Sequence, residues 1–351
     1  MIAAVRALVQ DGFGEAPTVR EVPDPVVPDG GVVVRVAVTG LCRSDWHAFA
    51  GHDDDVRLPH VGGHEWAGTV AALGAGVDHV RLGDRVTAPF VLACGTCGPC
   101  RAGEQQVCAD QQQPGFTGWG SFAELLAVPR AAVNLVPLPD EVDDASAALL
   151  GCRLATAFRA LLPVGRLQAG EWLAVHGCGG VGLSAVQVAV AAGARVVAVD
   201  VDAAARQRAL DLGAEAVVDA GEGGWADVAL RVRDASDGGT HVSLDALGSE
   251  AVVAASLAGL RARGRHVQVG LLPPVLGLPR VPLHLVVAGE LEVLGSHGMA
   301  AHAYPGLLAL VATGRLCPAD LVSRTVGLPE AGPLLAGMAT PSAPGVTLVR
   351  P

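Results

Sequence analysis

The sequence contains no lysine, and this absence excludes several chemistries. All 24 basic residues are arginines. Schiff-base enzymes, P-loop NTPases, protein kinases and Ser-Lys amidases each need a lysine, and arginine cannot be deprotonated to replace it. The single tyrosine, Tyr304, precedes Pro305 and has no lysine partner, so the Tyr-x-x-x-Lys pair of short-chain reductases is absent too. Acid–base chemistry must therefore come from histidine, cysteine, carboxylates, serine or a metal.

Charge and hydropathy further restrict the class of protein to which this sequence can belong. The 35 acidic residues outnumber the basic ones, for a formal charge of −11, and no stretch gathers arginines into a stripe. Nucleic acid and anionic membranes are therefore not expected partners. We find no apolar run of about 20 residues that could span a bilayer. Residues 1–6 lack the basic segment, apolar core and cleavage site of a leader, so we expect a cytoplasmic protein.

The length of 351 residues predicts about two domains. Residues 1–153 look strand-rich and loop-rich, whereas residues 154–293 alternate apolar strands with Ala- and Leu-rich helices, as in a doubly wound parallel sheet. We expect residues 294–351 to rejoin the first domain through a last strand. The expected strands lie at 31–38, 83–87, 171–175, 195–200, 242–245, 265–269 and 345–351, and the expected helices at 181–192 and 203–212.

A glycine motif lies between an expected strand and an expected helix. It reads Gly177-Cys178-Gly179-Gly180-Val181-Gly182. The glycines permit a tight turn that brings a pyrophosphate onto the helix N-terminus. Asp200 ends the next strand, where a carboxylate binds the adenosine ribose and repels a 2′-phosphate, which favours NAD over NADP. Arg206 and Arg208 lie near Asp200 in the sequence, so NADP stays open as the coenzyme. The alternative to a coenzyme site is an ordinary glycine turn of a doubly wound fold.

Four of the eight cysteines are closely spaced, at Cys94, Cys97, Cys100 and Cys108. Thiolates at such spacing can close a tetrahedral shell around zinc. A shell of four thiolates leaves no position for water or substrate, so this zinc would be structural. An iron–sulfur cluster or a redox-active cysteine pair is compatible with the same spacing.

A dispersed group of possible metal ligands comprises Cys42, His64 with Glu65, and Cys152. Sequence alone does not show that these residues meet, and a lone cysteine is most often a buried structural residue. Their neighbours favour a functional role. Residues 42–47 include a thiol, a hydroxyl, a carboxylate and an imidazole, and His64 lies in a glycine-rich segment.

Together these motifs resemble those of the zinc-dependent alcohol dehydrogenases of the medium-chain dehydrogenase/reductase superfamily. The resemblance covers essentially the full length in the right order. Its elements are Cys42-Arg43-Ser44-Asp45-x-His47, Gly63-His64-Glu65-x-x-Gly68, the four-cysteine segment, Gly151-Cys152, and the glycine motif followed by Asp200. It implies an α/β protein with a GroES-like, β-rich catalytic domain and a Rossmann coenzyme domain with a doubly wound parallel sheet.

The resemblance also implies roles for individual residues. Cys42, His64 and Cys152 would hold a catalytic zinc, and Glu65 would lie behind the metal as a transient ligand or field-tuning group. Asp45 would orient His64. The remaining implied roles are proton acceptance by Ser44, proton release through His47, contact of Arg43 with the pyrophosphate, and coenzyme contacts at Val269 and Gly270.

The resemblance implies an enzyme with two zinc ions and NAD(H) that oxidises a primary or secondary alcohol reversibly to an aldehyde or ketone. Trp46, Phe90 and Trp119 are candidate walls of the substrate pocket, although core or interface packing explains them equally well. The alternatives are a reductase of C=C or C=N bonds in a biosynthetic pathway, and a non-catalytic cofactor-binding protein. Analogy favours a homotetramer over a dimer.

Overall fold

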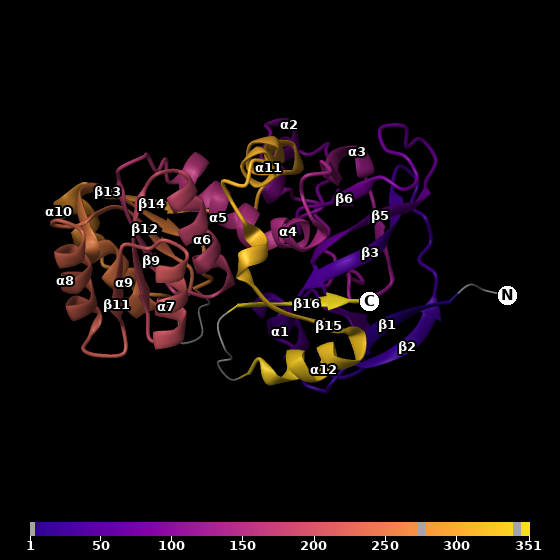
Figure 1. Ribbon diagram of the computed structural model, residues 1–351, viewed down its shortest axis with the longest axis horizontal. Coiled ribbons are helices and arrows are strands. Elements are labelled where there is room, and N and C mark those ends of the chain that lie inside the picture. Colours follow the sequence, from indigo (N-terminus) through magenta and orange to yellow (C-terminus); the bar gives the residue numbers. More distant parts are fainter. Residues whose placement is uncertain (1–3, 273–277, 340–344) are drawn as a thin grey trace. The chain divides into compact units, whose positions relative to one another are not determined.

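The computed structural model describes residues 4–272, 278–339 and 345–351. Its internal contacts divide the chain into two units (Figure 1): Met1–Ala155 with Gly298–Pro351, and Thr156–His297. The expected boundaries, after residues 153 and 293, lie close to these. Residues 1–3 of the N-terminal segment considered above lie outside the described residues.

The first unit contains two sheets. A small antiparallel sheet has the order β2-β1-β4, and a larger one has the order β15-β16-β3-β5-β6-β8, with β7 also paired to β3. As expected, the last strand, β16, rejoins the first unit by pairing with β3 (Figure 1). The strands are β1 (Ala4–Gln10), β2 (Thr18–Pro23), β3 (Val32–Gly40), β4 (His60–Val61), β5 (Glu65–Leu73), β6 (Arg85–Thr87), β7 (Leu125–Val128), β8 (Val136–Pro137), β15 (Val322–Gly327) and β16 (Val346–Arg350).

Short helices connect these strands. They are α1 (Arg43–Phe49), α2 (Gly98–Arg101), α3 (Ala131–Asn134), α4 (Asp144–Leu149), α11 (Tyr304–Ala312) and α12 (Leu328–Gly337). The core of the larger sheet consists of valines from β3, β5 and β6 packed around the buried Trp66. This unit therefore has the β-rich architecture predicted for the catalytic domain.

The second unit contains one parallel sheet with the order β11-β10-β9-β12-β13-β14. The order reverses between β9 and β12, and ligands of such sheets bind outside the carboxyl ends of the strands at this point. The parallel strand order with one reversal confirms the predicted doubly wound sheet. Its elements are β9 (Trp172–His176), β10 (Arg195–Asp200), β11 (Ala216–Asp219), β12 (Thr240–Asp245), β13 (Leu260–Gln268), β14 (Glu292–Gly295), α5 (Ala155–Arg159), α6 (Gly180–Ala191), α7 (Ala203–Asp211), α8 (Trp225–Ala235), α9 (Glu250–Gly259) and α10 (Leu283–Gly289).

One helical stretch corrects a sequence expectation. Asp144–Val164 is helical over 21 residues and is long and apolar enough to cross a membrane, although no such run was expected. However, 72% of its apolar window is buried inside the structure, as in a core helix. A π-helical turn, Leu150–Leu154, interrupts this stretch and carries Cys152. Such turns are frequent at functional sites.

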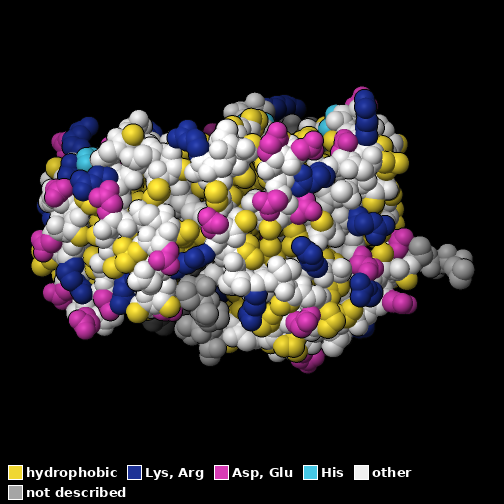
Figure 2. All heavy atoms as spheres, viewed as in Figure 1, with side chains coloured by type: hydrophobic (Ala, Val, Ile, Leu, Met, Phe, Trp, Pro, Cys, Tyr) yellow, Lys and Arg dark blue, Asp and Glu magenta, His cyan; other side chains and the backbone are white. Residues whose placement is uncertain are grey.

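The surface view is consistent with the charge composition. On the face drawn in Figure 2, arginine and acidic side chains are interspersed with apolar ones, and no basic stripe is visible there.

Candidate metal centres and coenzyme site

The dispersed group of possible ligands comes together in the first unit. One ligand atom from each of Cys42, His64, Glu65 and Cys152 lies within 4.8 Å of the others. Cys42 is the N-cap of α1, His64 and Glu65 lie at the start of β5, and Cys152 lies in the π-helical turn. Three separate segments thus bring two thiols, an imidazole and a carboxylate into one site.

Asp45 holds two of these segments in place. Its Oδ1 accepts a hydrogen bond from Nδ1 of His64 at 2.8 Å, and its Oδ2 accepts one from the backbone N–H of Cys42 at 2.8 Å. Asp45 therefore caps α1 and orients the imidazole at the same time. This is the arrangement expected of a carboxylate behind a metal-binding histidine.

The remaining chemistry of this group fits a divalent metal. Nε2 of His64 is buried and has no hydrogen-bond partner among the described residues. A hydrogen bond from Cys152 lowers the pKa of Cys42 well below its usual value, and the same contact raises the pKa of Cys152. One thiolate therefore forms readily while the second needs a cation beside it. Zinc prefers such ligands, and three of them leave a fourth position for a substrate oxygen.

Arg153, a residue that sequence reasoning missed, binds Glu65. Its Nε donates to both carboxylate oxygens, at 3.0 and 2.8 Å, and its backbone N–H donates to Oε1 at 2.9 Å. The Glu65 side chain is fully buried and that of Arg153 is 4% exposed. Burial raises the pKa of Glu65, and the Arg153 guanidinium opposes this shift. No local motif indicated Arg153, because the two residues are 88 positions apart.

The expected proton pathway begins near the thiols. The Ser44 hydroxyl lies 3.9 Å from Sγ of Cys42. His47 is exposed at the end of α1, and its Nδ1 lies 3.2 Å from Nδ1 of His52, which sequence reasoning also missed. Partial burial and the nearby Arg43 guanidinium lower the pKa of His47. Arg43 itself donates to the carbonyl of Met338 and lies over the Trp46 ring.

The three candidate pocket aromatics lie in different surroundings. The ring centroids of Phe90 and His64 are 6.3 Å apart, and Phe116, which was not predicted, lies closer, at 5.2 Å. Trp46 packs half-buried against a hydrophobic core cluster. Trp119 lines a surface groove, and its Nε1 donates to the carbonyl of Pro59. Phe90 is thus the only one of the three with a ring contact to a candidate ligand among the described residues.

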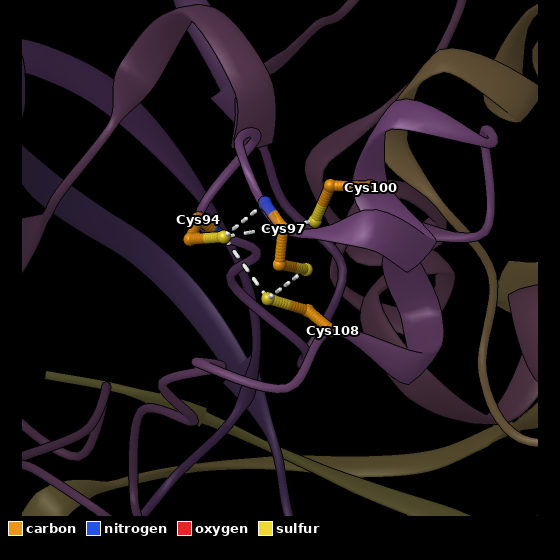
Figure 3. A group of neighbouring side chains, drawn as sticks. All are labelled: Cys94, Cys97, Cys100 and Cys108. Atoms are coloured by element: carbon orange, nitrogen blue, oxygen red, sulfur yellow. Dashed lines mark hydrogen bonds between the residues drawn. The ribbon is translucent and has the colours of Figure 1, made fainter.

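The four closely spaced cysteines converge on a common centre (Figure 3). The Cys94 and Cys100 sulfurs are 3.9 Å apart, and those of Cys97 and Cys108 are 3.7 Å apart. A tetrahedron with metal–sulfur bonds of about 2.3 Å has edges of about 3.8 Å, so these distances suit zinc. Backbone N–H groups of Thr96 and Cys97 donate to the Cys94 sulfur. The four cysteines of this group are free thiols.

The glycine motif has the geometry of a phosphate-binding turn. Gly177 has a φ of +92°, which L side chains rarely adopt. A Cβ on Gly182 would lie 1.7 Å from the carbonyl oxygen of Gly177, so α6 can approach β9 only with glycine there. A Cβ on Gly179 would meet no described atom within 4 Å. This open position at the N-terminus of α6, which begins at Gly180 and continues through Val181, fits a pyrophosphate.

Asp200 lies beside this turn at the end of β10. Its Oδ2 accepts from the backbone N–H of Cys178 at 2.6 Å, and its Oδ1 accepts from that of Asp202 at 2.9 Å. Arg206 donates to the Asp200 carbonyl and pairs with Asp219 at 2.7 Å. The Arg206 guanidinium, one of the two that could bind a 2′-phosphate, is therefore already paired with a carboxylate.

Asp245 and Gln268, which sequence reasoning missed, hold the segment with Val269 and Gly270. The Val269 and Gly270 N–H groups donate to the Asp245 carbonyl, and the Gln268 amide donates to the Asp245 carboxylate at 3.0 Å. The Asp245 carboxylate also accepts from the N–H groups of Leu247 and Gly248. These contacts fix the carboxyl ends of β12 and β13, next to the point where strand order reverses.

Comparisons with known proteins identify the family of this chain. The fold and the ligand groups define a two-unit, zinc-binding dehydrogenase, and two family models match: the alcohol dehydrogenase GroES-like domain over residues 28–140 and the zinc-binding dehydrogenase domain over residues 180–313. An alcohol dehydrogenase of Geobacillus stearothermophilus is 34% identical over 295 residues, which are 83% of this chain and 84% of that protein.

Two further relatives extend the comparison. An alcohol dehydrogenase of Rhizobium meliloti (strain 1021) is 37% identical over 314 residues, which are 84% of this chain and 90% of that protein. The solved structure of the alcohol dehydrogenase TADH from Thermus sp. ATN1 has a TM-score of 0.89 at 33% identity, covering 98% of this chain and 99% of that one. This chain therefore belongs to the zinc-type alcohol dehydrogenases of the medium-chain dehydrogenase/reductase superfamily.

Proposed function

We propose that this protein is an NAD-dependent zinc alcohol dehydrogenase that interconverts primary or secondary alcohols with aldehydes or ketones. The observation that carries the proposal is the convergence of Cys42, His64 and Cys152, with a buried Nε2 that lacks a partner. Family membership supports alcohol oxidoreduction in general. The choice of NAD, the two zinc ions and the substrate class are our proposal.

The residues around the metal ligands suit this chemistry. When bound, zinc would supply a Lewis acid for the substrate oxygen and NAD would supply the hydride acceptor. Ser44 would accept the hydroxyl proton, and His47, paired with His52 at the surface, would release it to solvent. Phe90 and Phe116 would exclude water beside His64. The pocket roles of Trp46 and Trp119 and the pyrophosphate contact of Arg43 stay predictions.

Metal analysis combined with activity tests the proposal. The purified protein should contain two zinc ions per chain and reduce NAD with alcohols, followed by NADH absorbance. Cys42→Ala should lose one zinc together with the activity, whereas Cys317→Ala, at an exposed cysteine outside both ligand groups, should keep both. A single zinc in the wild-type protein, or turnover of imines or enals only, would refute the proposal.

The proposed preference for NAD is supported by Asp200 and by the pairing of Arg206 with Asp219. Fluorescence titration should give tighter binding of NADH than of NADPH, because the carboxylate accepts from a ribose hydroxyl and repels a phosphate. Asp200→Ser should bring the affinities for NADH and NADPH closer together, because it removes the repulsion between the carboxylate and the 2′-phosphate. Tighter binding of NADPH to the wild-type protein would overturn this assignment.

We further propose a cytoplasmic homotetramer. The free thiols of the two ligand groups support a reducing compartment. In the second unit, β14 is an edge strand of the sheet and α10 contains no buried residue. The side chains of Leu283, Val287 and Val293 are 62%, 79% and 47% exposed. An apolar surface of this kind beside an open sheet edge supports self-association.

A further inference from the structure

The guanidinium of Arg153 contacts all three segments that carry the candidate ligands of the catalytic metal. Arg153 directly follows Cys152 in the chain. It binds both oxygens of Glu65, the neighbour of His64, and its Nη2 donates to the carbonyl of Leu41, the neighbour of Cys42, at 2.9 Å. The residue adjacent to each protein ligand is therefore Arg153 itself or one of its hydrogen-bond partners.

We propose that Arg153 is a positioning residue that holds the Cys42, His64 and Cys152 segments in the geometry of the metal site and keeps Glu65 from becoming a permanent ligand. The inference deepens the proposed function, since it rests on these three residues being the ligands of the catalytic metal. It assigns the buried ion pair a task in retaining the metal.

The geometry of arginine suits this task. Its planar fork presents several N–H groups at fixed angles, so one side chain can bind a carboxylate with two donors and still reach a backbone carbonyl. A lysine ammonium at the same place could not reproduce that set of contacts. The π-helical turn that bears Cys152 also bears Arg153, so movement of the Cys152 thiol and movement of the Arg153 guanidinium are linked.

The charges of Arg153 and Glu65 explain why Glu65 is expected not to become a permanent metal ligand. Both carboxylate oxygens are bound by Arg153, and the side chain is fully buried. Arg153 and Glu65 offset each other, so the two thiolates are the ligand charge that faces a divalent cation. Without the guanidinium, a buried carboxylate within 4.8 Å of the other ligand atoms would turn to the metal and occupy the position meant for substrate.

Metal release from the holoenzyme tests the proposal. Arg153→Lys keeps the charge but loses the fork. Because Arg153→Met alone would leave a buried carboxylate unpaired, the second variant is Arg153→Met with Glu65→Met, which replaces the pair by apolar side chains. Arg85→Met is the matched control, since Arg85 also pairs with a carboxylate, Asp144, and a backbone carbonyl, Val142, in the same unit.

The readouts are zinc transfer to a chromophoric chelator and the visible spectrum of the cobalt-substituted catalytic site. We expect both Arg153 variants to lose the catalytic metal about 10- to 100-fold faster than the wild type, a typical effect of residues behind metal ligands. The four-cysteine zinc should be released at the wild-type rate. The Arg153→Lys cobalt spectrum should shift because the three ligand segments lose their fixed geometry, and Arg85→Met should change neither readout.

Two results would overturn the inference. One is release of the catalytic metal at the wild-type rate from either Arg153 variant. The other is failure to fold, or equal loss of both metals, in the double variant, since Arg153 would then hold the whole domain. If the wild type lacks a second metal, the proposed function fails first. If the wild type binds two metals and the variants retain them, only the role of Arg153 is wrong.

Discussion

At the residue scale, the types of the functional groups were predictable and most of their partners were not. The motifs identified Cys42, His64 and Cys152 because metal chemistry needs thiols and imidazoles. They did not identify Arg153 or Phe116, because an arginine or a phenylalanine is equally common in an ion pair or a core elsewhere. Their importance arises from contacts between distant segments, which no local spacing encodes.

His176, the last residue of β9, should make stability depend on pH. Burial, together with the nearby His266, lowers its pKa to about 3. The unfolded chain therefore binds a proton that the native protein does not between about pH 6.5 and pH 3, so stability falls as the pH falls through this range. Nε2 of His176 also lacks a partner among the described residues.

Replacing His176 by valine should remove this dependence. Between pH 7 and pH 5 the wild type should lose about 2 kcal/mol more of unfolding free energy than His176→Val, with zinc saturating in both. Urea unfolding followed by tryptophan fluorescence measures the difference. Between pH 7 and pH 8 the two proteins should change in parallel. Parallel curves below pH 7 as well would show that the native histidine accepts a proton.

At the element scale, the prediction was good where the pattern is long and regular. The β9-α6-β10-α7 segment lies within a residue or so of its expected bounds, because apolar strands and glycine turns mark each end. β13 begins at Leu260, well before the expected start at residue 265. Its pairing with β12 passes from Leu260 directly to Arg265, so the continuously paired part of the strand begins at the expected residue.

Two glycines of the α6 turn should respond differently to alanine. Gly182→Ala places a Cβ 1.7 Å from the carbonyl oxygen of Gly177, so it should destabilise the protein by about 1–3 kcal/mol or more. Gly179→Ala adds a Cβ in open space and should leave the melting temperature nearly unchanged. It should weaken NADH binding at least about tenfold, since the methyl group occupies the phosphate position.

Thermal unfolding without coenzyme and NADH fluorescence titration separate these effects. Each variant serves as the control for the other, because one tests packing of the helix and the other tests approach of the ligand. If Gly179→Ala bound NADH as tightly as the wild type, the pyrophosphate would not lie at this turn. A fully stable Gly182→Ala would mean that α6 can move away from β9 at little cost.

At the scale of the whole molecule, composition excluded classes of function, whereas the proposed assembly rests on the surface of one unit. α10 and the edge strand β14 expose the apolar side chains of Leu283, Val287 and Val293 on this surface. Val287→Glu adds a charge to this face and should dissociate the assembly, because two copies would each bury an unpaired carboxylate. Light scattering should give a wild-type mass close to four times the 35.4 kDa of the chain, and a smaller mass for the variant.

A second apolar residue of the same unit provides the control. Leu230, on α8, is 60% exposed, and Leu230→Glu should leave the mass unchanged. If Leu230→Glu dissociated the protein and Val287→Glu did not, the interface would lie at α8. A monomeric wild type would remove the homotetramer proposal altogether.

The sequence by itself determined the residue types available for chemistry, the two-domain order and the four-cysteine group, whose members are close in the chain and therefore close in space. It excluded lysine chemistry by composition alone. Only the tertiary structure decided that Arg153 contacts three ligand segments, and that Trp119 lines a groove with no candidate ligand among its described lining residues. These arrangements join residues that are far apart in the chain. Packing of the two sheets of the first unit, and of the segments that connect their strands, determines which of those residues meet.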